Sequence, residues 1–254
     1  MHKTSIKHIK LFINHYISKK SKILEVGSQS VNSITLRDIF DKQHEYTGID
    51  IVDGNNVDVV QKDPIKIPFQ DDTFDVVVST SAFEHTEFFW IVFNEIIRVL
   101  KPNGVFYLNA PSNGRYHKYP VDCYRFYPDS GKALCKWGVH SGYKKLVVLE
   151  SFIGKRNGGL WNDFCCIFLK DEFYLNRYPD RIINNFDEFN YGISYEKNEV
   201  KNNFPSDEDD NFNILKSILL YYIKNKPIII VKKLLNIFGL FGFFKKIYKM
   251  IKSK

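Results

Sequence analysis

Residues 22–31 read Lys-Ile-Leu-Glu-Val-Gly-Ser-Gln-Ser-Val, a short apolar run that ends in an acid and passes into a turn of small residues. An apolar run of this length followed by glycine predicts a buried strand and a tight turn. In an open α/β sheet, such a turn lies at the carboxyl end of the strand, where these folds bind ligands. The stretch therefore predicts that Glu25 and Gly27 lie at a ligand site.

The same turn argues against a dinucleotide. Gln29 and Asn32 stand where the fingerprint Gly-x-Gly-x-x-Gly has its later glycines. A carboxylate at the strand end suits a cation or hydroxyl groups better than a pyrophosphate. A ligand other than NAD is therefore favoured.

A second short strand that ends in an acid follows the first. Tyr46 to Asp50 read Tyr-Thr-Gly-Ile-Asp, and Asp50 comes 25 residues after Glu25. At this separation, a strand-helix-strand unit places a carboxylate on a ribose diol. Asp50 is therefore the predicted ribose ligand.

Further motifs follow in a fixed order. They are Lys62-Asp63-Pro64, Ile67-Pro68-Phe69, Asp72 to Ser79, Ala82-Phe83-Glu84-His85, and Arg98 to Gly104 before the strand Val105 to Asn109. Over roughly residues 20–170, this series resembles the class I S-adenosylmethionine (SAM)-dependent methyltransferases of type 11. The resemblance implies an α/β fold, with a Rossmann-like, seven-stranded, mostly parallel sheet flanked by helices and a C-terminal helical extension. It also implies SAM as the cofactor.

The resemblance assigns cofactor contacts to individual residues. Glu25 matches the acid near the methionine end of SAM, and Gly27 lets the backbone approach the ligand, although Ser28 and Ser30 replace glycines common in the family. The remaining matches are Asp50 for the ribose, Ile51 for the adenine face, Asp63 for the adenine amino group, and Ser79 with Thr80 beside the methionine moiety. Asp63 is also in a position to begin a turn before Pro64.

Helical periodicity predicts an amphipathic helix over residues 4–19, with its histidines at the surface, and further helices over 33–40 and 87–100. Residues 145–152 and 163–170 are expected to form the last two strands. In the family, these two strands form an antiparallel hairpin.

The segment from Ala110 to Pro128 is long, aromatic and basic, and it leaves the predicted sheet above the methyl-donor position. Arg115 and Arg125 suit phosphate or carboxylate, and Tyr116 and Tyr119 offer surfaces for a sugar or base, so these four are the predicted acceptor ligands. The alternative is an ordered lid with structural tyrosines. Residues 117–128 resemble a subset of these enzymes associated with bacterial capsule and surface-polysaccharide biosynthesis.

Two kinds of chemistry remain open for this region. His85 or His117 can act as the general base for a sugar hydroxyl, with Asp122 orienting the histidine. An already anionic phosphate or phosphoramidate oxygen instead needs its charge held by arginine or by a metal. Glu84, His85, His117 and Asp122 together would suit a divalent ion, although Glu84-His85 is also an ordinary feature of the family's fourth motif.

Composition divides the chain into three parts: a methyltransferase domain over 1–170, an irregular extension rich in acids and asparagine over 171–210, and a basic amphipathic helical tail over 211–254. The tail contains ten lysines and no acid, so the rest of the chain carries a net charge of −3 within a total of +7. We expect the tail to lie on an anionic membrane surface or to pack on protein, since its longest apolar run, residues 234–244, is shorter than the about 20 residues that span a bilayer. A nucleic-acid partner is not expected.

The four cysteines indicate the compartment in which the protein works. Four cysteines without framework spacing favour reduced thiols in a cytoplasmic protein that can lie peripherally at the inner membrane face. We expect O-methylation of a small phosphorylated or sugar-nucleotide precursor of surface polysaccharide, including a phosphoramidate group. The alternative is a catalytically inactive methyltransferase-like protein that acts as a peripheral membrane or complex-forming partner.

Overall fold

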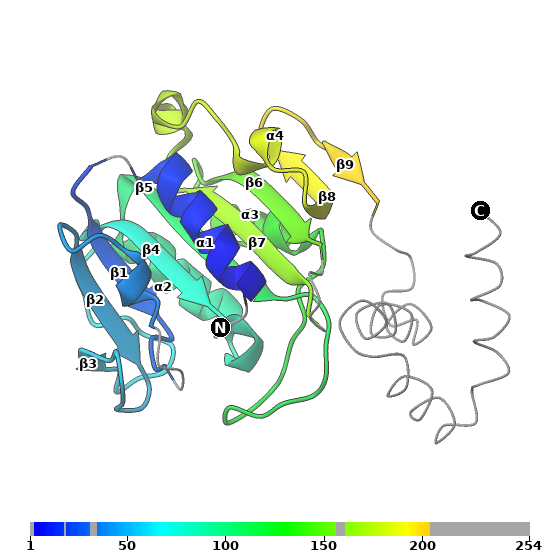
Figure 1. The fold of residues 1–254 in the computed structure, drawn as a ribbon. Coiled ribbons are helices and arrows are strands. Elements are labelled where there is room, and N and C mark those ends of the chain that lie inside the picture. Colours follow the sequence, from blue (N-terminus) through cyan, green and yellow to red (C-terminus); the bar gives the residue numbers. More distant parts are fainter. Residues whose placement is uncertain (1–2, 18, 31–34, 156–160, 204–254) are drawn as a thin grey trace, which may run out of the picture. The chain divides into compact units, whose positions relative to one another are not determined.

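The computed structural model describes residues 3–17, 19–30, 35–155 and 161–203, which belong to one compact unit (Figure 1). Its helices are α1 (Lys3–Tyr16), α2 (Phe89–Val99), α3 (Ser130–His140) and α4 (Ile182–Asn185), with 3₁₀ helices η1 (Arg37–Ile39), η2 (Phe83–His85) and η3 (Glu172–Arg177). Its strands are β1 (Lys22–Val26), β2 (Glu45–Asp50), β3 (Val59–Val60), β4 (Phe74–Thr80), β5 (Leu100–Pro111), β6 (Val147–Gly154), β7 (Asp163–Leu169), β8 (Phe189–Ser194) and β9 (Lys201–Asn202).

The strands of the described region form a sheet in the order β3-β2-β1-β4-β5-β7-β6-β8-β9. The strands from β3 to β5 in this order are parallel, whereas β7 runs antiparallel to both β5 and β6. The first seven strands confirm the predicted Rossmann-like sheet, and β6 with β7 confirms the predicted hairpin.

The segment after residue 170 corrects the prediction of an irregular extension. Over its described part, β8 pairs antiparallel with β6, and β9 pairs with β8. The side chains of Ile182, Ile183, Phe186 and Phe189 are buried in the core on the α1 side of the sheet. The pattern escaped detection because these apolar residues are scattered among asparagines and acids. Residues 171–203 therefore extend the sheet.

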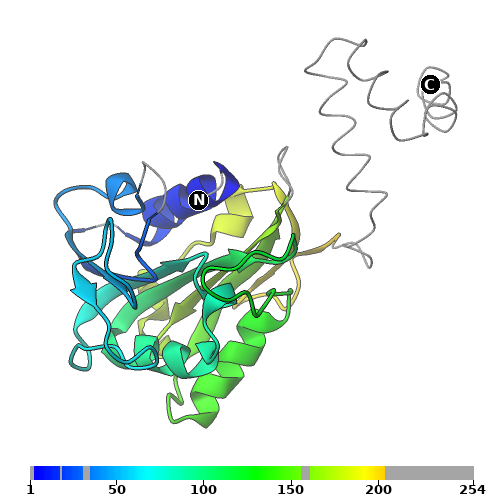
Figure 2. The same cartoon turned by 90° about the horizontal axis from the view of Figure 1, so that it is seen from below.

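Two apolar cores lie on the two faces of the sheet. α1 packs on one face through Phe12, and α2 and α3 pack on the other through Phe93 and Leu134. Because successive side chains of a strand point to opposite faces, Val78 of β4 joins the first core and Val77 joins the second. Figure 2 shows α1, in dark blue, and α3, in green, on opposite sides of the sheet.

The N-terminal helix is confirmed, but its buried face differs from the prediction. Ser5, His8, Ile9 and Phe12 are all buried, so His8 was wrongly expected at the surface. His8 contacts Cys165 through Nδ1 at 3.5 Å and lies edge-on to Phe152. The buried face of α1 therefore contains both polar and apolar side chains, and it packs the start of the helix on the sheet.

The predicted helix over 33–40 is reduced to η1 in its described part. Asp38 accepts hydrogen bonds from both the backbone N–H and the hydroxyl of Thr35, each at 2.8 Å. The chain then turns to an extended conformation at Phe40, which ends the 3₁₀ helix. Since the N–H of Asp38 also donates to the Thr35 hydroxyl, this reciprocal pattern caps the start of η1, and the extended backbone at Phe40 is what keeps η1 short.

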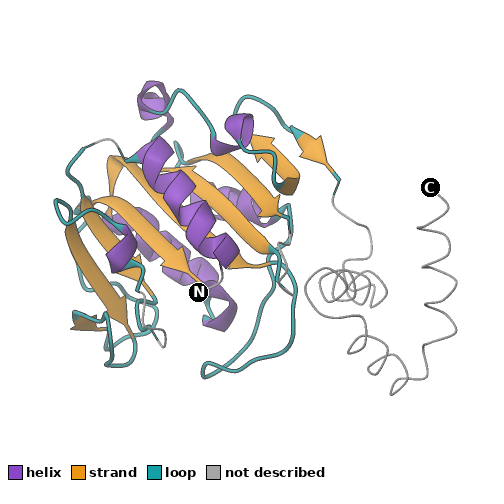
Figure 3. Ribbon diagram, in the orientation of Figure 1, coloured by secondary structure: helices purple, strands orange, loops and turns teal. Residues whose placement is uncertain are grey.

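Functional residues gather at one edge of the sheet. The carboxyl ends of the parallel strands β1, β2, β4 and β5 meet there, and the long loop after β5 extends beyond that edge (Figure 3). In an open α/β sheet this edge binds ligands.

No helix within the described ranges has the length and apolar character needed to cross a membrane. The tail over 211–254 and its predicted helices lie outside the described residues.

Candidate active site

The loop after β1 depends on Gly27. This residue has φ +78°, and a Cβ built on it would lie 2.3 Å from the Cβ of Ala82. The backbone N–H groups of Gly27 and Ser28 both donate to the carbonyl of Ile49, each at 3.0 Å. Glycine is therefore required both by the backbone conformation and by the close approach of the segment after β4.

Glu25 is buried at the end of β1 and has two donors. The hydroxyl of Tyr46 and the amide of Asn56 both donate to its Oε2 at 2.7 Å. Burial raises the pKa of Glu25 to about 7, although these two hydrogen bonds act in the opposite direction. The carboxyl group is therefore poised to ionise when a cation approaches.

Tyr46 and Asn56 were not predicted as site residues. Tyr46 pairs with Ile23, two residues before Glu25, so the strand register places its side chain on the Glu25 face. Asn56 has φ +74° in the sequence Gly54-Asn55-Asn56. That turn composition was a usable signal, since asparagine tolerates this conformation.

Asp50 clamps the β1 loop from the end of β2. Its Oδ2 accepts from the backbone N–H of Gln29 at 2.9 Å, and its Oδ1 accepts from Val52 at 3.3 Å. The neighbouring Ile51 side chain is 47% exposed, an uncommon condition for a large apolar residue next to a buried strand. A carboxylate beside an open apolar surface suits a nucleoside.

The other predicted cofactor residues have local partners. Asp63 is exposed, and its Oδ1 accepts from the N–H of Ile65 at 3.0 Å, which is the turn considered as its alternative role. Ser79 is buried and donates to the carbonyl of Val26 at 2.9 Å, which fastens β4 to the end of β1. Ser28 is the exception, because it is buried in this loop and its hydroxyl has no hydrogen-bond partner among the described residues.

The segment after β5 folds back onto η2 and reaches the β1 loop. The N–H groups of Cys123 and Tyr124 donate to the carbonyl of Glu84 at 2.7 and 3.2 Å. The hydroxyl of Tyr119 donates to the side chain of Gln29 at 3.2 Å. This segment is therefore an ordered cover beside the β1 loop.

Arg125 and Asp122 hold this cover together. Two hydrogen bonds of 2.5 and 2.8 Å join the guanidinium to the carboxylate, which holds the pKa of Asp122 at about 2. Arg125 also donates to the carbonyls of Tyr124 and Arg115. The guanidinium of Arg125 was predicted to bind the acceptor, but most of its N–H groups donate to partners within residues 111–128. In this structure, Arg125 therefore acts as a positioning residue.

Three of the four predicted metal or catalytic residues meet beneath the cover. Ligand atoms of Glu84, His85 and His117 all lie within 4.8 Å of one another. Burial raises the pKa of Glu84 to about 8, and burial lowers that of His85. Asp122 is not in this group, because its two oxygens face Arg125. It does accept from the N–H of His117 at 2.6 Å, which supports its predicted orienting role.

Arg115 and Tyr116 lie at the surface of the segment. Both are exposed, Tyr116 to 71%. The carbonyl of Arg115 accepts from Arg125, so its backbone is fixed while its side chain reaches outward. These two residues remain suitable for holding an acceptor.

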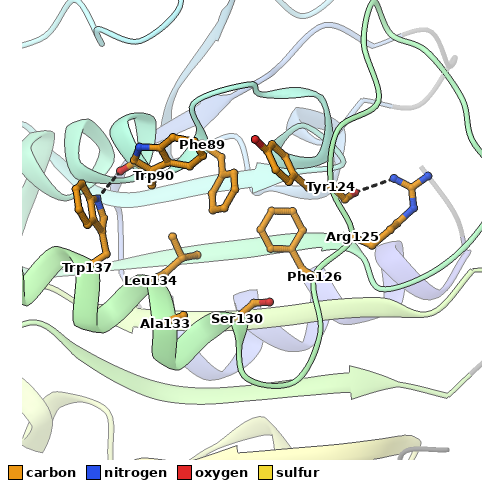
Figure 4. A pocket seen from close by; sticks show the side chains of 9 residues that line it. All are labelled: Phe89, Trp90, Tyr124, Arg125, Phe126, Ser130, Ala133, Leu134 and Trp137. Carbon is orange, nitrogen blue, oxygen red and sulfur yellow. Dashed lines mark hydrogen bonds between the residues drawn. The ribbon is translucent and has the colours of Figure 1, made fainter. Parts of the chain in front are cut away.

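An aromatic pocket of about 490 Å³ lies between α2, α3 and the end of the segment (Figure 4). The polar atoms of two of its aromatic side chains donate to backbone carbonyls. Trp137 Nε1 donates to the carbonyl of Trp90 at 2.9 Å, and the Tyr124 hydroxyl donates to the carbonyl of Glu87 at 3.0 Å. Figure 4 shows the Arg125 guanidinium directed away from this pocket. The pocket is therefore mainly aromatic and apolar, with Arg125 among the residues that line it.

Comparisons with known proteins agree with this geometry. Residues 21–108 match a family model described as a methyltransferase domain. Over this range, which runs from β1 into β5, the chain is similar to a methyltransferase domain. Among solved structures, the methyltransferase fold is similar to that of the Burkholderia thailandensis 1,6-didemethyltoxoflavin-N1-methyltransferase with its substrate and S-adenosylhomocysteine bound. The identity is 12%, the TM-score is 0.51, and the alignment covers 66% of this chain and 79% of that one.

A SAM-dependent methyltransferase of Methanosarcina mazei is also similar, with 15% identity and a TM-score of 0.48 over 63% of this chain and 97% of that one. No curated protein matches the chain.

The residues at the carboxyl ends of β1 and β2 fit SAM by their chemistry. Asp50 offers a carboxylate for ribose hydroxyls, Ile51 an exposed apolar side chain for adenine, and Glu25 an ionisable carboxyl group for an ammonium group. The backbone at Gly27 can approach a ligand without a side chain in between.

Proposed function

We propose that the protein transfers the methyl group of SAM to an oxygen of a small phosphorylated or sugar-nucleotide acceptor held under residues 111–128. The observation that carries this proposal is the contact of Tyr119 with Gln29, because it joins the acceptor segment to the cofactor loop. A segment in this position covers the site of transfer and excludes water.

Methyl transfer from a sulfonium is an in-line displacement, so the protein acts mainly by alignment. SAM bound at Glu25, Asp50 and Ile51 supplies an electrophilic methyl group. Asp50 also fixes the β1 loop through the N–H of Gln29, and Arg125 keeps the acceptor segment closed through Asp122.

Two routes deliver the acceptor oxygen. For a hydroxyl, His85 or His117 can accept the proton, and burial favours the neutral form of His85 by lowering its pKa. For an oxygen that is already anionic, the need is to hold charge, which Arg115 can do from the surface of the segment. A divalent metal at Glu84, His85 and His117 belongs to the second route.

The resemblance of residues 117–128 to enzymes of capsule and surface-polysaccharide biosynthesis supports a precursor of such a polymer as the acceptor, with a phosphoramidate group among the candidates. A cytoplasmic location of the reaction would fit the expected reduced cysteines. The Cys165 and Cys166 thiols are buried, and burial raises the pKa of both.

We also propose a peripheral contact for residues 211–254, either with an anionic membrane surface or with another subunit. The ten lysines and the absence of acids in this range support electrostatic attraction to an anionic surface. Each lysine that reaches an anionic membrane surface contributes about 1 kcal/mol to the free energy of binding.

The acceptor proposal is tested by incubating the intact protein with methyl-labelled SAM and a panel of sugar phosphates, nucleotide sugars and phosphoramidates. Label should pass to a phosphorylated acceptor, and Arg115→Ala should raise its KM about 10- to 100-fold, as expected for a lost charged hydrogen bond. Lys118→Ala is the matched control, since Lys118 is an exposed cation of the same segment. Equal effects of the two substitutions would remove Arg115 from the acceptor site. Failure to bind S-adenosylhomocysteine would favour the inactive, complex-forming alternative.

A further inference from the structure

Glu84, His85 and His117 form a compact group of one carboxylate and two imidazoles. Glu84 and His85 belong to η2, directly after β4, and His117 comes from the segment after β5. His85 Nε2 lies 3.7 Å from Glu84 Oε1, and the two imidazole centroids are 4.9 Å apart. Ligand atoms on one zinc-like ion lie about 4 Å apart or closer, so these three, all within 4.8 Å of one another, need to draw together only slightly to bind an ion.

The orientation of both rings is fixed by the backbone. Nδ1 of His85 lies 2.5 Å from the carbonyl of Val121, and Nδ1 of His117 lies 3.1 Å from that of Arg115. A carbonyl oxygen only accepts hydrogen bonds, so in the neutral form of each ring Nδ1 carries the proton and Nε2 carries the lone pair. Metal-binding histidines are oriented in this way, with one nitrogen bonded to a carbonyl and the other free for the ion.

The burial of Glu84 is a second observation that indicates a bound cation, separate from the spacing of the three side chains. The Glu84 side chain is 1% exposed, and its Oε2 is buried without a hydrogen-bond partner among the described residues. A buried carboxylate oxygen left without a partner costs free energy, and a cation would remove that cost. Imidazole and carboxylate together favour a divalent transition metal over calcium or magnesium.

We propose that Glu84, His85 and His117 bind a divalent ion of the zinc or manganese class that holds an anionic oxygen of the acceptor. Three protein ligands leave at least one coordination position open, as in catalytic metal sites. Asp122 is not a ligand, which corrects the predicted set of four. It pairs with Arg125 and orients His117 through its backbone N–H.

The site lies next to the cofactor loop. Ala82, whose carbonyl accepts from the N–H of His85 at 3.0 Å, approaches Gly27 so closely that no side chain fits between them. The role of the ion rests on the proposed function, whereas its binding does not. In the transfer step, an electron pair of the anionic acceptor oxygen forms the new O–CH₃ bond. The S–CH₃ bond breaks, and its pair stays on sulfur as a neutral thioether, so no proton moves.

The test is calorimetric titration of the intact protein with Zn²⁺ alone, in a Cys123→Ser background because Cys123 is exposed beside Glu84. We expect about one equivalent to bind, with affinity reduced at least about 100-fold by Glu84→Gln and by His117→Ala. His140→Ala, an exposed histidine of α3, should leave binding unchanged. His117→Ala keeps the test valid if Glu84→Gln does not fold. Equal Zn²⁺ affinity in all variants, or no binding, would overturn the site.

A second arm separates this site from the cofactor site. S-adenosylhomocysteine should bind His117→Ala and the parent protein equally, while inorganic phosphate should bind the parent more tightly with Zn²⁺ than without. Zn²⁺ binding without S-adenosylhomocysteine binding would retain the metal site and refute the proposed function. Phosphate affinity that does not respond to Zn²⁺ would refute the acceptor-holding role.

Discussion

Glu25 carries a carboxyl group whose charge depends on what lies beside it. In the structure without cofactor, burial raises its pKa to about 7. An ammonium group bound nearby favours the ionised form, so binding should release a proton at lower pH. Affinity for S-adenosylhomocysteine should therefore rise about tenfold from pH 6 to pH 8. Calorimetry in buffers of different ionisation enthalpy measures both the affinity and the proton release.

Glu25→Gln is the control for this prediction, since glutamine keeps an acceptor for Tyr46 and Asn56 but cannot ionise. Its affinity should be lower and nearly independent of pH over the same range. A pH dependence identical to that of the unmodified protein would show that Glu25 does not face the ammonium group.

Gly27→Ala should destabilise the fold through two separate effects. The positive φ costs about 1–2 kcal/mol for a residue with a Cβ, and the 2.3 Å approach to Ala82 adds about 1–3 kcal/mol of overpacking. Gly142→Ala is the matched control, because Gly142 has φ +114° and its Cβ would meet nothing within 4 Å. Urea unfolding should show a larger loss for Gly27→Ala. Equal losses would mean that the β1 loop moves aside without cost.

At this scale, local motifs predicted Gly27 and Asp50 because turn conformation and strand ends are visible in short stretches of sequence. They did not predict Tyr46 or Asn56 as partners of Glu25, since those contacts arise only when β1 and β2 pair in a particular register. The ion pair of Arg125 with Asp122 also depends on how the long loop folds. The sequence of that loop was compatible both with Arg125 binding the substrate and with Arg125 bonding within the loop.

Among the elements, α1 and α4 are both bound to β6 by one carboxyl group. Glu150 of β6 is buried and accepts from the Tyr16 hydroxyl and from the N–H groups of Ile182 and Ile183, at 2.5, 2.9 and 3.0 Å. Burial raises its pKa. Glu150 therefore connects α1, β6 and the start of α4.

Glu150→Ala should lower the free energy of unfolding by about 3 kcal/mol, because three buried donors lose their acceptor at about 1 kcal/mol or more each. Denaturant unfolding measures this loss. Glu172→Ala, an exposed glutamate of η3, should change stability by less than about 0.5 kcal/mol. A negligible effect of Glu150→Ala would show that the region after residue 170 is not integral to the fold.

Periodicity was sufficient for α1 and α2, because each has a strong repeat, whereas the β6–β7 hairpin was predicted from the resemblance to the family. It was insufficient for the described part of residues 33–40, where the backbone becomes extended at Phe40 and ends the helix after η1. It also missed β8, whose burial depends on pairing with β6 rather than on its own composition.

For the whole molecule, charge separates the tail from the rest of the chain. Residues 211–254 contain ten lysines and no acids. The 254-residue chain should therefore co-sediment with anionic vesicles, and a chain ending at residue 210 should do so much less. Added salt should weaken the interaction, and neutral vesicles should bind less. Equal sedimentation of both chains would refute the membrane contact and leave contact with a subunit as the proposal.

The claim that a cofactor site lies at the carboxyl edge of β1 and β2 is tested most directly by calorimetric titration of the intact protein with S-adenosylhomocysteine. Binding should be micromolar, and Asp50→Ala and Asp50→Asn should weaken it at least about tenfold, as for the loss of charged hydrogen bonds. Asp41→Ala, an exposed aspartate outside the site, should leave the affinity unchanged. Absence of binding, or equal binding by the Asp50 variants, would contradict the assignment of this edge as the SAM site.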